Sequence, residues 1–368
     1  MVKIHVPITE RRDASYDILI GRGLLADLPA LVGAACAAPR YAVITDSHVG
    51  PLYGRAAVAR CRDATLRAEL FEFPAGEWNK TRETWAMLCD RMLAAQFGRD
   101  SAVIALGGGV VGDVAGFVAA TYLRGVPYVQ VPTSLLAMID ASIGGKTGVD
   151  VPAGKNLLGA FHQPRLVVLD LDALATLAPV QIAAGMAEAI KHGVIGDADY
   201  FGFLEREQPA IAAKDPHALT RVVQRSVEIK AAVVAADERE AGRRALLNFG
   251  HTVGHAIEAS AKFAVLHGEA VAIGMAYEAR LAEALGVAER GMAERVRTLI
   301  ARYGLPLERP ETAAVDDLIA AMQLDKKARA GTVRFAVPRA IGVMHGSETD
   351  GWTVAAPERL VREVLAGV

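Results

Sequence analysis

The sequence predicts an α/β domain followed by a helical domain, and three observations support this. Its 368 residues exceed twice the ~150 residues of a common domain, which favours two domains. Before residue 175, short apolar runs alternate with helical stretches, as in a parallel sheet with helices on both faces. From 180 to 300 the chain is rich in Ala, Leu, Glu and Arg with little β-branched clustering, which indicates long helices. We therefore expect domains over residues 1–175 and 176–368.

The expected elements follow in chain order. We expect strands at residues 41–45, 101–106, 128–131 and 166–169, with helices that include residues 84–96 and 110–123. In the second domain the helical pattern is broken near Asp215-Pro216 and near Gly268. A turn-rich stretch at 305–310 then precedes a last helix and a short strand-like run at 332–337.

The composition argues against several classes of protein. Hydrophobic residues make up 52% of the chain and the formal net charge is −2, so neither a basic nucleic-acid binder nor a polybasic membrane protein is expected. No apolar run reaches the ~18 residues of a membrane span, and the N-terminus lacks a signal pattern. The three cysteines form no CxxC pair, which favours a reducing compartment. We expect a soluble, cytoplasmic protein.

A glycine-rich segment, GGGVVG at 107–112, follows an expected strand and opens an expected helix. It matches G-x-G-x-x-G, in which glycines let backbone amides approach a pyrophosphate. The acidic residue usual ~20 residues downstream is missing, since none lies between Asp113 and Asp140. Asp46, at the end of an earlier strand, is the candidate for that role. We predict a dinucleotide held by several loops, with a ligand-free turn as the alternative.

Histidines and a carboxylate suggest a metal site in the helical part. His251 and His255 stand four residues apart, hence on one helical face, and His267 follows sixteen residues after His251. Glu188 lies three residues before Lys191 on another expected helix. One carboxylate and two imidazoles with an open position suit a catalytic Zn²⁺. The HxxxH spacing disfavours a zinc protease of the HExxH type, and a pair of surface histidines is the alternative.

Residues 140–156 form the stretch that is densest in candidate functional residues. Two Lys, an Asn and several Gly in this stretch are poor helix or strand formers and good anion binders, so we expect a polar loop. The run from Gly144 to Thr147 resembles the end of a Walker loop. That motif needs a glycine where Asp140 stands, so a P-loop ATPase is rejected.

Together these segments resemble the 3-dehydroquinate synthases, a family of sugar-phosphate cyclases. The matching motifs lie at 107–117, 122–125, 130–136, 144–149, 154–156, 159–161, 187–191, 248–255 and 266–269. Their order is that of the family, and fainter similarity extends over nearly the whole chain. The resemblance implies a Rossmann-like N-terminal α/β domain, an all-α C-terminal domain and an active site between them.

The resemblance also implies the chemistry. Family members form homodimers, bind NAD and one divalent metal (Zn²⁺ or Co²⁺), and convert 3-deoxy-D-arabino-heptulosonate 7-phosphate to 3-dehydroquinate and phosphate. The substrate is oxidised, loses phosphate by β-elimination, is reduced again, and closes by an intramolecular aldol step. The sequence thus suggests a phosphate-eliminating lyase of the shikimate pathway, which supplies aromatic amino acids.

The family's functional residues carry over to matching positions of this chain. The implied metal ligands are Glu188, His251 and His267. The implied nucleotide contacts are Asp46, Ala75, Gly76, Glu77, Trp78, Asn79, Lys80, Gly109, Val110, Val111, Gly112, Asp113, Thr133, Ser134, Lys146, Lys155, Ala173, Leu174, Ala175 and Thr176. The implied substrate and catalytic residues are Asp140, Lys146, Asn156, Lys191, Lys230, Glu240, Arg244, Asn248, His255 and one of Lys326 or Lys327, with Arg124 reaching from a neighbouring subunit. His255 is the candidate for proton relay.

The chain departs from the common family pattern in a few places. Ser134, Met138, Ala141 and Asp150 stand where the family commonly has Thr, Gln, Ser and Asn, and residues 178–182 also differ. Asp150 adds a negative charge beside the expected anion loop. Three alternatives stay open: another sugar-phosphate cyclase, a metal-dependent polyol or alcohol dehydrogenase, and a non-catalytic binding protein. The dehydrogenases lack a phosphate clamp, which the cationic residues above provide.

Overall fold

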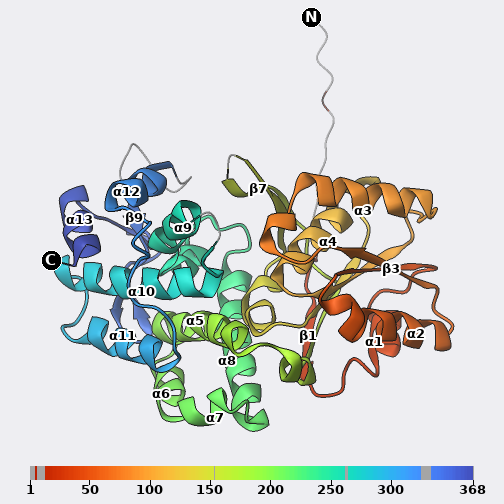
Figure 1. Cartoon of the computed structure of the whole chain (residues 1–368), viewed down its shortest axis with the longest axis horizontal. Helices are drawn as coiled ribbons and strands as arrows, with labels where there is room; N and C mark the ends of the chain where they lie inside the picture. The colour runs from red at the N-terminus through yellow and green to blue at the C-terminus, as the bar shows by residue number, and fades with distance from the viewer. Residues whose placement is uncertain (1–4, 6–12, 153, 262–263, 325–332, 368) are drawn as a thin grey trace, which may run out of the picture.

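The computed structural model describes residues 5, 13–152, 154–261, 264–324 and 333–367. In Figure 1 a sheet with flanking helices forms one half of the molecule, and a group of helices forms the other. The two halves meet where α8 (Pro216–Ala236) packs on the sheet strand β1 (Asp17–Gly21) and on the π-helical turn η4 (Ala137–Ala141). The α/β and helical halves predicted from the sequence are thus confirmed.

The sheet of the N-terminal half has six strands, all parallel, in the order β1-β8-β5-β4-β2-β3. These are β1 (Asp17–Gly21), β2 (Tyr41–Asp46), β3 (Ala68–Phe73), β4 (Ala102–Gly107), β5 (Tyr128–Pro132) and β8 (Leu166–Asp170). The four central strands are buried along their whole length, which is why they read as continuous apolar runs and were predicted. The edge strands β1 and β3 were not predicted: two glutamates interrupt the apolar residues of β3, and the apolar run of β1 covers only residues 18–20.

Helices cover both faces of this sheet. α1 (Leu28–Ala35) and α2 (Arg55–Asp63) pack on one face; α3 (Arg82–Ala94) and α4 (Gly109–Thr121) pack on the other. Successive side chains of β2 point to opposite faces of the sheet: Val43 packs with α1 and α2, and Ile44 packs with α3 and α4. Figure 1 shows α3 and α4 above the sheet and α1 and α2 below it.

The stretch 140–156, predicted as a polar loop, is largely regular structure, so that prediction was wrong. After η4 the chain forms an antiparallel hairpin of β6 (Lys146–Val151) and β7 (Gly154–Phe161). Gly148 and Gly159 face each other across it, and a Cβ on Gly159 would lie 2.2 Å from the carbonyl oxygen of Thr147. The glycines therefore permit close strand pairing here, whereas the sequence pattern predicted a polar loop.

The C-terminal half is built on the nearly all-buried helix α5 (Pro179–Gly196). The other helices are α6 (Ala198–Arg206), α7 (Gln208–Ala212), α8, α9 (His251–Ser260), α10 (His267–Ala284), α11 (Met292–Arg302), α12 (Val315–Leu324) and α13 (Glu358–Ala366). Four short strands complete it: β9 (Arg334–Phe335), β10 (Pro338–Ala340), β11 (Val343–Met344) and β12 (Val354–Ala355). The breaks expected near residues 215 and 268 are the starts of α8 and α10.

The connection between the halves runs through the 3₁₀ turn η5 (Leu171–Thr176) to the start of α5. The predicted boundary between residues 175 and 176 falls in this connection and stays a prediction. One hydrophobic cluster joins Val167 and Leu169 of β8 to the helical half. None of the helices in the described part of the chain is both long and apolar enough to cross a membrane.

Helices α9 and α10 approach each other through glycines. A Cβ on Gly274 of α10 would lie 1.8 Å from the carbonyl oxygen of Gly250, the residue before α9. Gly250 itself has φ +79°, in the left-handed region that favours glycine. The backbone of α10 therefore lies directly against the start of α9, and a side chain at either position would push the helices apart.

We expect Gly274→Ala to destabilise the fold by at least the ~1–3 kcal/mol typical of overpacking, because backbone rather than a movable side chain occupies the space. Gly33→Ala is the matched control: Gly33 lies in α1 with no atom within 4 Å of its Cβ position, so Ala should be neutral or stabilise by ~0.5–1 kcal/mol. Urea unfolding of both variants measures this. Wild-type stability of Gly274→Ala would contradict the close packing.

Candidate active site

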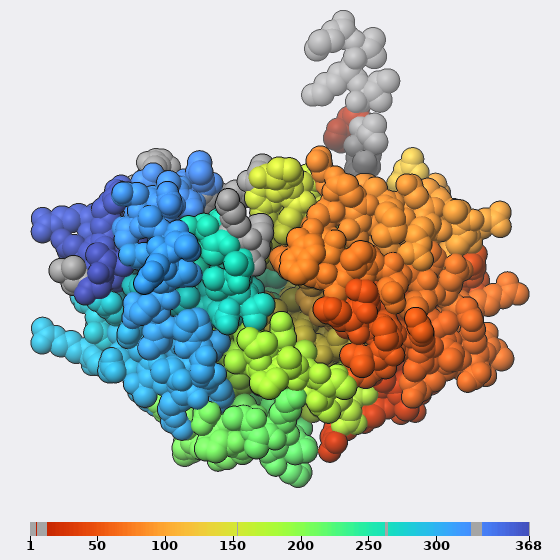
Figure 2. All heavy atoms as spheres, viewed as in Figure 1, coloured from red at the N-terminus to blue at the C-terminus, as the bar shows by residue number. Residues whose placement is uncertain are grey.

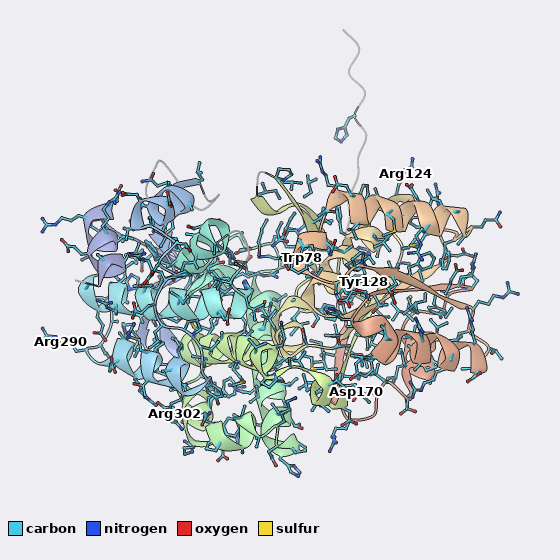
Figure 3. All side chains as sticks on the ribbon, viewed as in Figure 1. Trp78, Arg124, Tyr128, Asp170, Arg290 and Arg302 are labelled. Atoms are coloured by element: carbon cyan, nitrogen blue, oxygen red, sulfur yellow. The ribbon has the colours of Figure 1, made fainter. Side chains whose placement is uncertain are left out.

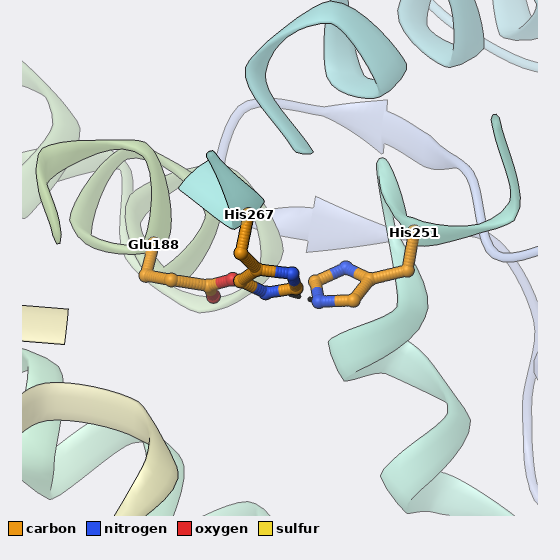
Figure 4. Close-up of side chains that lie close together, drawn as sticks. All are labelled: Glu188, His251 and His267. Atoms are coloured by element: carbon orange, nitrogen blue, oxygen red, sulfur yellow. Dashed lines mark ion pairs between the residues drawn. The ribbon is translucent and has the colours of Figure 1, made fainter. Parts of the chain in front are cut away.

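Three side chains from three helices converge in the C-terminal half. Glu188 of α5 is fully buried, and its Oε1 lies 3.4 Å from the Nε2 of His251 and 3.4 Å from the Nε2 of His267. These three ligand atoms all lie within 4.8 Å of one another. Figure 4 shows both imidazoles turned toward the carboxylate. The structure thus brings together the three residues predicted as metal ligands.

The other nitrogen of each imidazole is anchored by an acceptor. The Nδ1 of His251 lies 3.1 Å from the carbonyl oxygen of Phe249, and the Nδ1 of His267 lies 3.3 Å from Oε1 of Glu258. Because a carbonyl or carboxylate oxygen accepts, each Nδ1 carries the hydrogen and each Nε2 is left as a ligand atom. Both rings are therefore oriented as metal-binding histidines usually are.

The donor set fits a divalent cation. Neither oxygen of Glu188 has a hydrogen-bond partner of good geometry among the described residues, although the Lys191 ammonium pairs with Oε2. Burial and the Lys191 charge lower the pKa of His251 to about 4, so its Nε2 lone pair is available at neutral pH. Burial disfavours a charged His267, but Glu258 and Glu188 outweigh this cost and raise its pKa to about 10, so a cation bound here would displace the proton from its Nε2. One carboxylate and two imidazole nitrogens with room for further ligands match catalytic zinc sites.

Beside this cluster, Asp140 of η4 holds two buried lysines. Its Oδ1 lies 2.6 Å from the Nζ of Lys230 of α8 and 3.6 Å from the Nζ of Lys191 of α5. Lys230 also donates to the backbone oxygen of Asp140 at 2.6 Å. Burial, together with the neighbouring Lys191, lowers the pKa of Lys230 to about 8 despite the charge of Asp140. Two ammonium groups are thereby held close to the metal-ligand cluster.

A second group links the hairpin to the segment after α8. Lys146 of β6 pairs with Glu240, and Glu240 accepts a hydrogen bond from the Asn248 side chain at 3.0 Å. Arg244 is almost wholly buried and donates to the backbone oxygens of Gly144 and Glu238. Its Nε has no partner among the described residues. The predicted substrate residues Lys146, Glu240 and Asn248 therefore do lie together, whereas Arg244 holds the backbone that precedes the hairpin.

The turn of the hairpin reaches the helical half. Lys155 of β7 pairs with Glu77 at 3.3 Å and with Glu258 of α9 at 2.9 Å. Asn156 has φ +52°, and its backbone N–H donates to Oδ1 of Asp150 at 2.8 Å. Asp150, one of the departures from the family pattern, thus fixes the turn that carries both residues.

The predicted nucleotide residues gather at the carboxyl ends of the strands. The chain runs from β2 outward to β3 and then returns to β4 on the other side of β2, so the strand order reverses between β2 and β4. Parallel sheets bind ligands at such a point. Asp46 ends β2, and the glycine turn ends β4 and starts α4 at Gly109, whose first-turn amides have no helical partner. Strand, turn and helix lie as predicted.

Further predicted nucleotide residues border the same edge of the sheet. The N–H of Thr133 donates to the carbonyl of Gly107 at 2.9 Å, and Ser134 follows it. Lys80 is buried and pairs with Asp113 at 2.5 Å, which joins the 75–80 segment to α4. Residues 173–176 lie in η5, which follows β8. Trp78 is 74% exposed, and Figure 3 shows it near the junction of the two halves, where the surface in Figure 2 is hollowed.

The remaining predicted catalytic residues are Arg124, Lys326, Lys327 and His255. Figure 3 shows Arg124 at the outer edge of the N-terminal half, so a single chain does not bring it to the metal-ligand cluster. Lys326 and Lys327 lie outside the described residues. His255 stacks edge-on against His251, with ring centroids 5.3 Å apart, as its place one turn along α9 requires.

Sequence reasoning missed two buried carboxylates. Glu258 contacts His267, and Glu278 of α10 accepts the backbone N–H groups of Gly250 and Val253 at 2.7 and 3.0 Å, which caps the start of α9. The sequence feature that could have identified Glu258 as part of the site is its position seven residues after His251, on the same helical face. Glu278 gave no comparable signal, because its partners are backbone groups of a distant segment.

Comparisons with known proteins agree with this geometry. Residues 70–184 match the 3-dehydroquinate synthase N-terminal family model, and residues 185–328 match the 3-dehydroquinate synthase C-terminal model. A 3-dehydroquinate synthase of Symbiobacterium thermophilum is 50% identical over 331 residues, covering 89% of this chain and 92% of the relative.

Two solved structures are similar over nearly the whole chain. One is 2-epi-5-epi-valiolone synthase from Streptomyces hygroscopicus with NAD⁺ and Zn²⁺ bound; it is 31% identical, has a TM-score of 0.89, and the match covers 98% of this chain and 99% of that one. The other is 2-deoxy-scyllo-inosose synthase complexed with carbaglucose-6-phosphate, NAD⁺ and Co²⁺, 26% identical with a TM-score of 0.86 and 95% of each chain covered. The two family models together span most of the chain, and it belongs to the 3-dehydroquinate synthase family.

Proposed function

We propose that this chain converts 3-deoxy-D-arabino-heptulosonate 7-phosphate to 3-dehydroquinate and phosphate, using NAD⁺ and one Zn²⁺ or Co²⁺. The observation that carries the proposal is the convergence of Glu188, His251 and His267 beside two buried lysines held by Asp140. A metal-ligand set next to a cationic cluster suits a substrate with hydroxyl groups and two anionic groups, a carboxylate and a phosphate. The high identity to relatives named 3-dehydroquinate synthase supports the same substrate.

A divalent cation at the three ligands would supply Lewis acidity toward the substrate hydroxyls, and NAD⁺ would supply a reversible hydride acceptor. The chain's own residues bind and orient the substrate. Lys191 and Lys230 are fixed by Asp140, so their ammonium groups are already positioned when an anionic group arrives. His255, one helical turn from His251, is our candidate for moving protons.

Hydrogen-bond donors from both halves, three of them cationic, favour a phosphate ester over a simple alcohol. Lys146 and Asn156 come from the hairpin, and Lys191 and Lys230 come from the helical half. Each ammonium group already pairs with a carboxylate, and a phosphate adds charge-assisted hydrogen bonds that a neutral alcohol cannot supply. This argues against a polyol dehydrogenase, which would share the cofactor and the metal.

We further propose a homodimer in the cytoplasm. The outer strand β7 of the hairpin exposes three large apolar side chains, Leu157, Leu158 and Phe161, at 37%, 42% and 41%. Exposed apolar side chains on a strand with a free edge are typical of an interface. A second subunit would also give Arg124 an active site to reach.

The reaction itself gives the first test. A cyclase returns the hydride to the substrate that supplied it, so we expect one phosphate released per heptulosonate phosphate consumed with only catalytic NAD⁺. Absorbance at the NADH wavelength should not accumulate. NADH formed one-for-one with substrate, or oxidation of glycerol without phosphate release, would overturn the proposal in favour of a dehydrogenase.

Lys146 gives the second test. Its side chain is 49% exposed, so its pair with Glu240 adds little stability, and Lys146→Met should keep the wild-type melting temperature. Loss of a charge-assisted contact to substrate should lower kcat/KM by ~10- to 100-fold. Arg295→Met is the matched control, because Arg295 is 48% exposed and pairs with Glu205 on the far side of the helical half. Equal kinetics for both variants would remove Lys146 from the site.

The dimer gives the third test. If Arg124 serves the neighbouring site, Arg124→Ala and Lys146→Met chains will each be impaired alone. A mixed dimer of the two, isolated with two affinity tags, carries one intact site and should recover up to about half the activity. Light scattering should show twice the mass of the 38.9 kDa chain. A monomer, or a mixed dimer without recovery, would argue against a shared site.

A further inference from the structure

Glu258 is a buried carboxylate for which the proposed mechanism has no use. It is 2% exposed and lies in α9, seven residues after His251 and three after His255. Residues at these spacings share one helical face, so α9 presents a carboxylate and two imidazoles to the same region. A buried carboxylate needs partners that offset its desolvation.

The partners of Glu258 come from two different halves of the molecule. Its Oε1 lies 3.3 Å from Nδ1 of His267, the first residue of α10, and 2.9 Å from Nζ of Lys155 in the hairpin. The Nε2 of His267 faces Oε1 of Glu188 at 3.4 Å. The ring of His267 is therefore held between two carboxylates, one at each nitrogen.

This arrangement allows two sites for a cation, and the contacts favour one of them. Glu258 with His255 and His267 forms a second group of possible ligands beside that of Glu188. At Glu258 the Lys155 ammonium lies 2.9 Å from Oε1, the same oxygen that faces His267, whereas at Glu188 the Lys191 ammonium pairs with Oε2 and leaves Oε1 facing both histidines. His251 is anchored at Nδ1 and offers its Nε2 to Glu188. The cation therefore belongs at Glu188, and Glu258 acts from behind the ring of His267.

We propose that Glu258 is a positioning residue of the metal centre, an inference that rests on the proposed function. Its carboxylate accepts the Nδ1 hydrogen of His267, which fixes the ring's orientation and makes Nε2 a stronger ligand. Lys155 compensates the charge of Glu258 from the other side. The sheet half of the molecule thus supports a metal centre whose ligands all come from the helical half.

The test measures Zn²⁺ affinity by competition with a chromophoric chelator, using the metal alone and no substrate. We expect Glu258→Ala to weaken Zn²⁺ binding by ~10- to 100-fold, the usual effect of losing such a partner. Glu258→Gln keeps an oxygen acceptor, so it should lose less than Glu258→Ala but remain weaker than wild type. Glu188→Gln removes a ligand and should lose more than either. Glu205→Gln, in α6, should equal wild type.

The visible absorption of the Co²⁺-loaded protein gives a second readout, because a rotated His267 changes the ligand field. We expect band positions or intensities to change in Glu258→Ala and to return toward wild type in Glu258→Gln. If Glu258→Ala fails to fold, the smaller effects of Glu258→Gln on affinity and spectrum decide the matter.

Each contrary outcome has a distinct meaning. Wild-type affinity and spectrum in the Glu258 variants, with Glu188→Gln impaired, would overturn the positioning role and leave the metal centre standing. Loss of binding in Glu258→Ala with normal binding in Glu188→Gln would place the cation in the His255 group and also overturn it. A wild-type chain that binds no metal would instead contradict the proposed function.

Discussion

The buried carboxylate of Glu188 is the constraint around which the C-terminal half is organised. It lies at 0% exposure in the middle of α5, where an uncompensated charge would cost several kcal/mol. Lys191, one turn further along the same helix, offsets part of that cost, and the remaining oxygen faces His251 and His267. Those histidines are in range only because the glycine contact lets α10 lie against the start of α9. The same helices therefore determine both the packing of this half and the geometry of the site.

A second regularity is that lysines near the junction of the two halves are paired with carboxylates. Lys146 pairs with Glu240, Lys155 with Glu258, and Lys230 with Asp140. Such pairs avoid the penalty of buried unpaired charge and keep the side chains in a defined place. Under the proposed function, an anionic substrate would compete with these carboxylates for the lysines. A stronger lysine–carboxylate pair within the protein would then weaken substrate binding, even where the carboxylate does not touch the substrate.

The sequence predicted the parts whose signals are local. Continuous apolar runs gave the central strands, and the i, i+4 spacing of His251 and His255 placed both on α9. The β6–β7 hairpin was missed because its glycines and lysines are individually poor strand formers, and only pairing across Gly148 and Gly159 makes them a strand. Distant partners were missed for the same reason: what Glu278 does depends on which backbone amides the fold brings to it. Family resemblance supplied the ligand set, which composition alone left open.

The hairpin and the metal centre can change in different ways as the family evolves. It contributes Lys146, Lys155 and Asn156 from sixteen consecutive residues, 146–161, while the metal ligands are distributed over three helices. If the hairpin contacts the substrate as proposed, substitutions that alter which sugar phosphate fits can accumulate within this one short segment. The metal centre, in contrast, depends on helix packing throughout the C-terminal half. Under the proposed roles, specificity can therefore diversify at Lys146, Asn156 and their neighbours, whereas Lys155 is constrained by its pair with Glu258 beside the metal ligands.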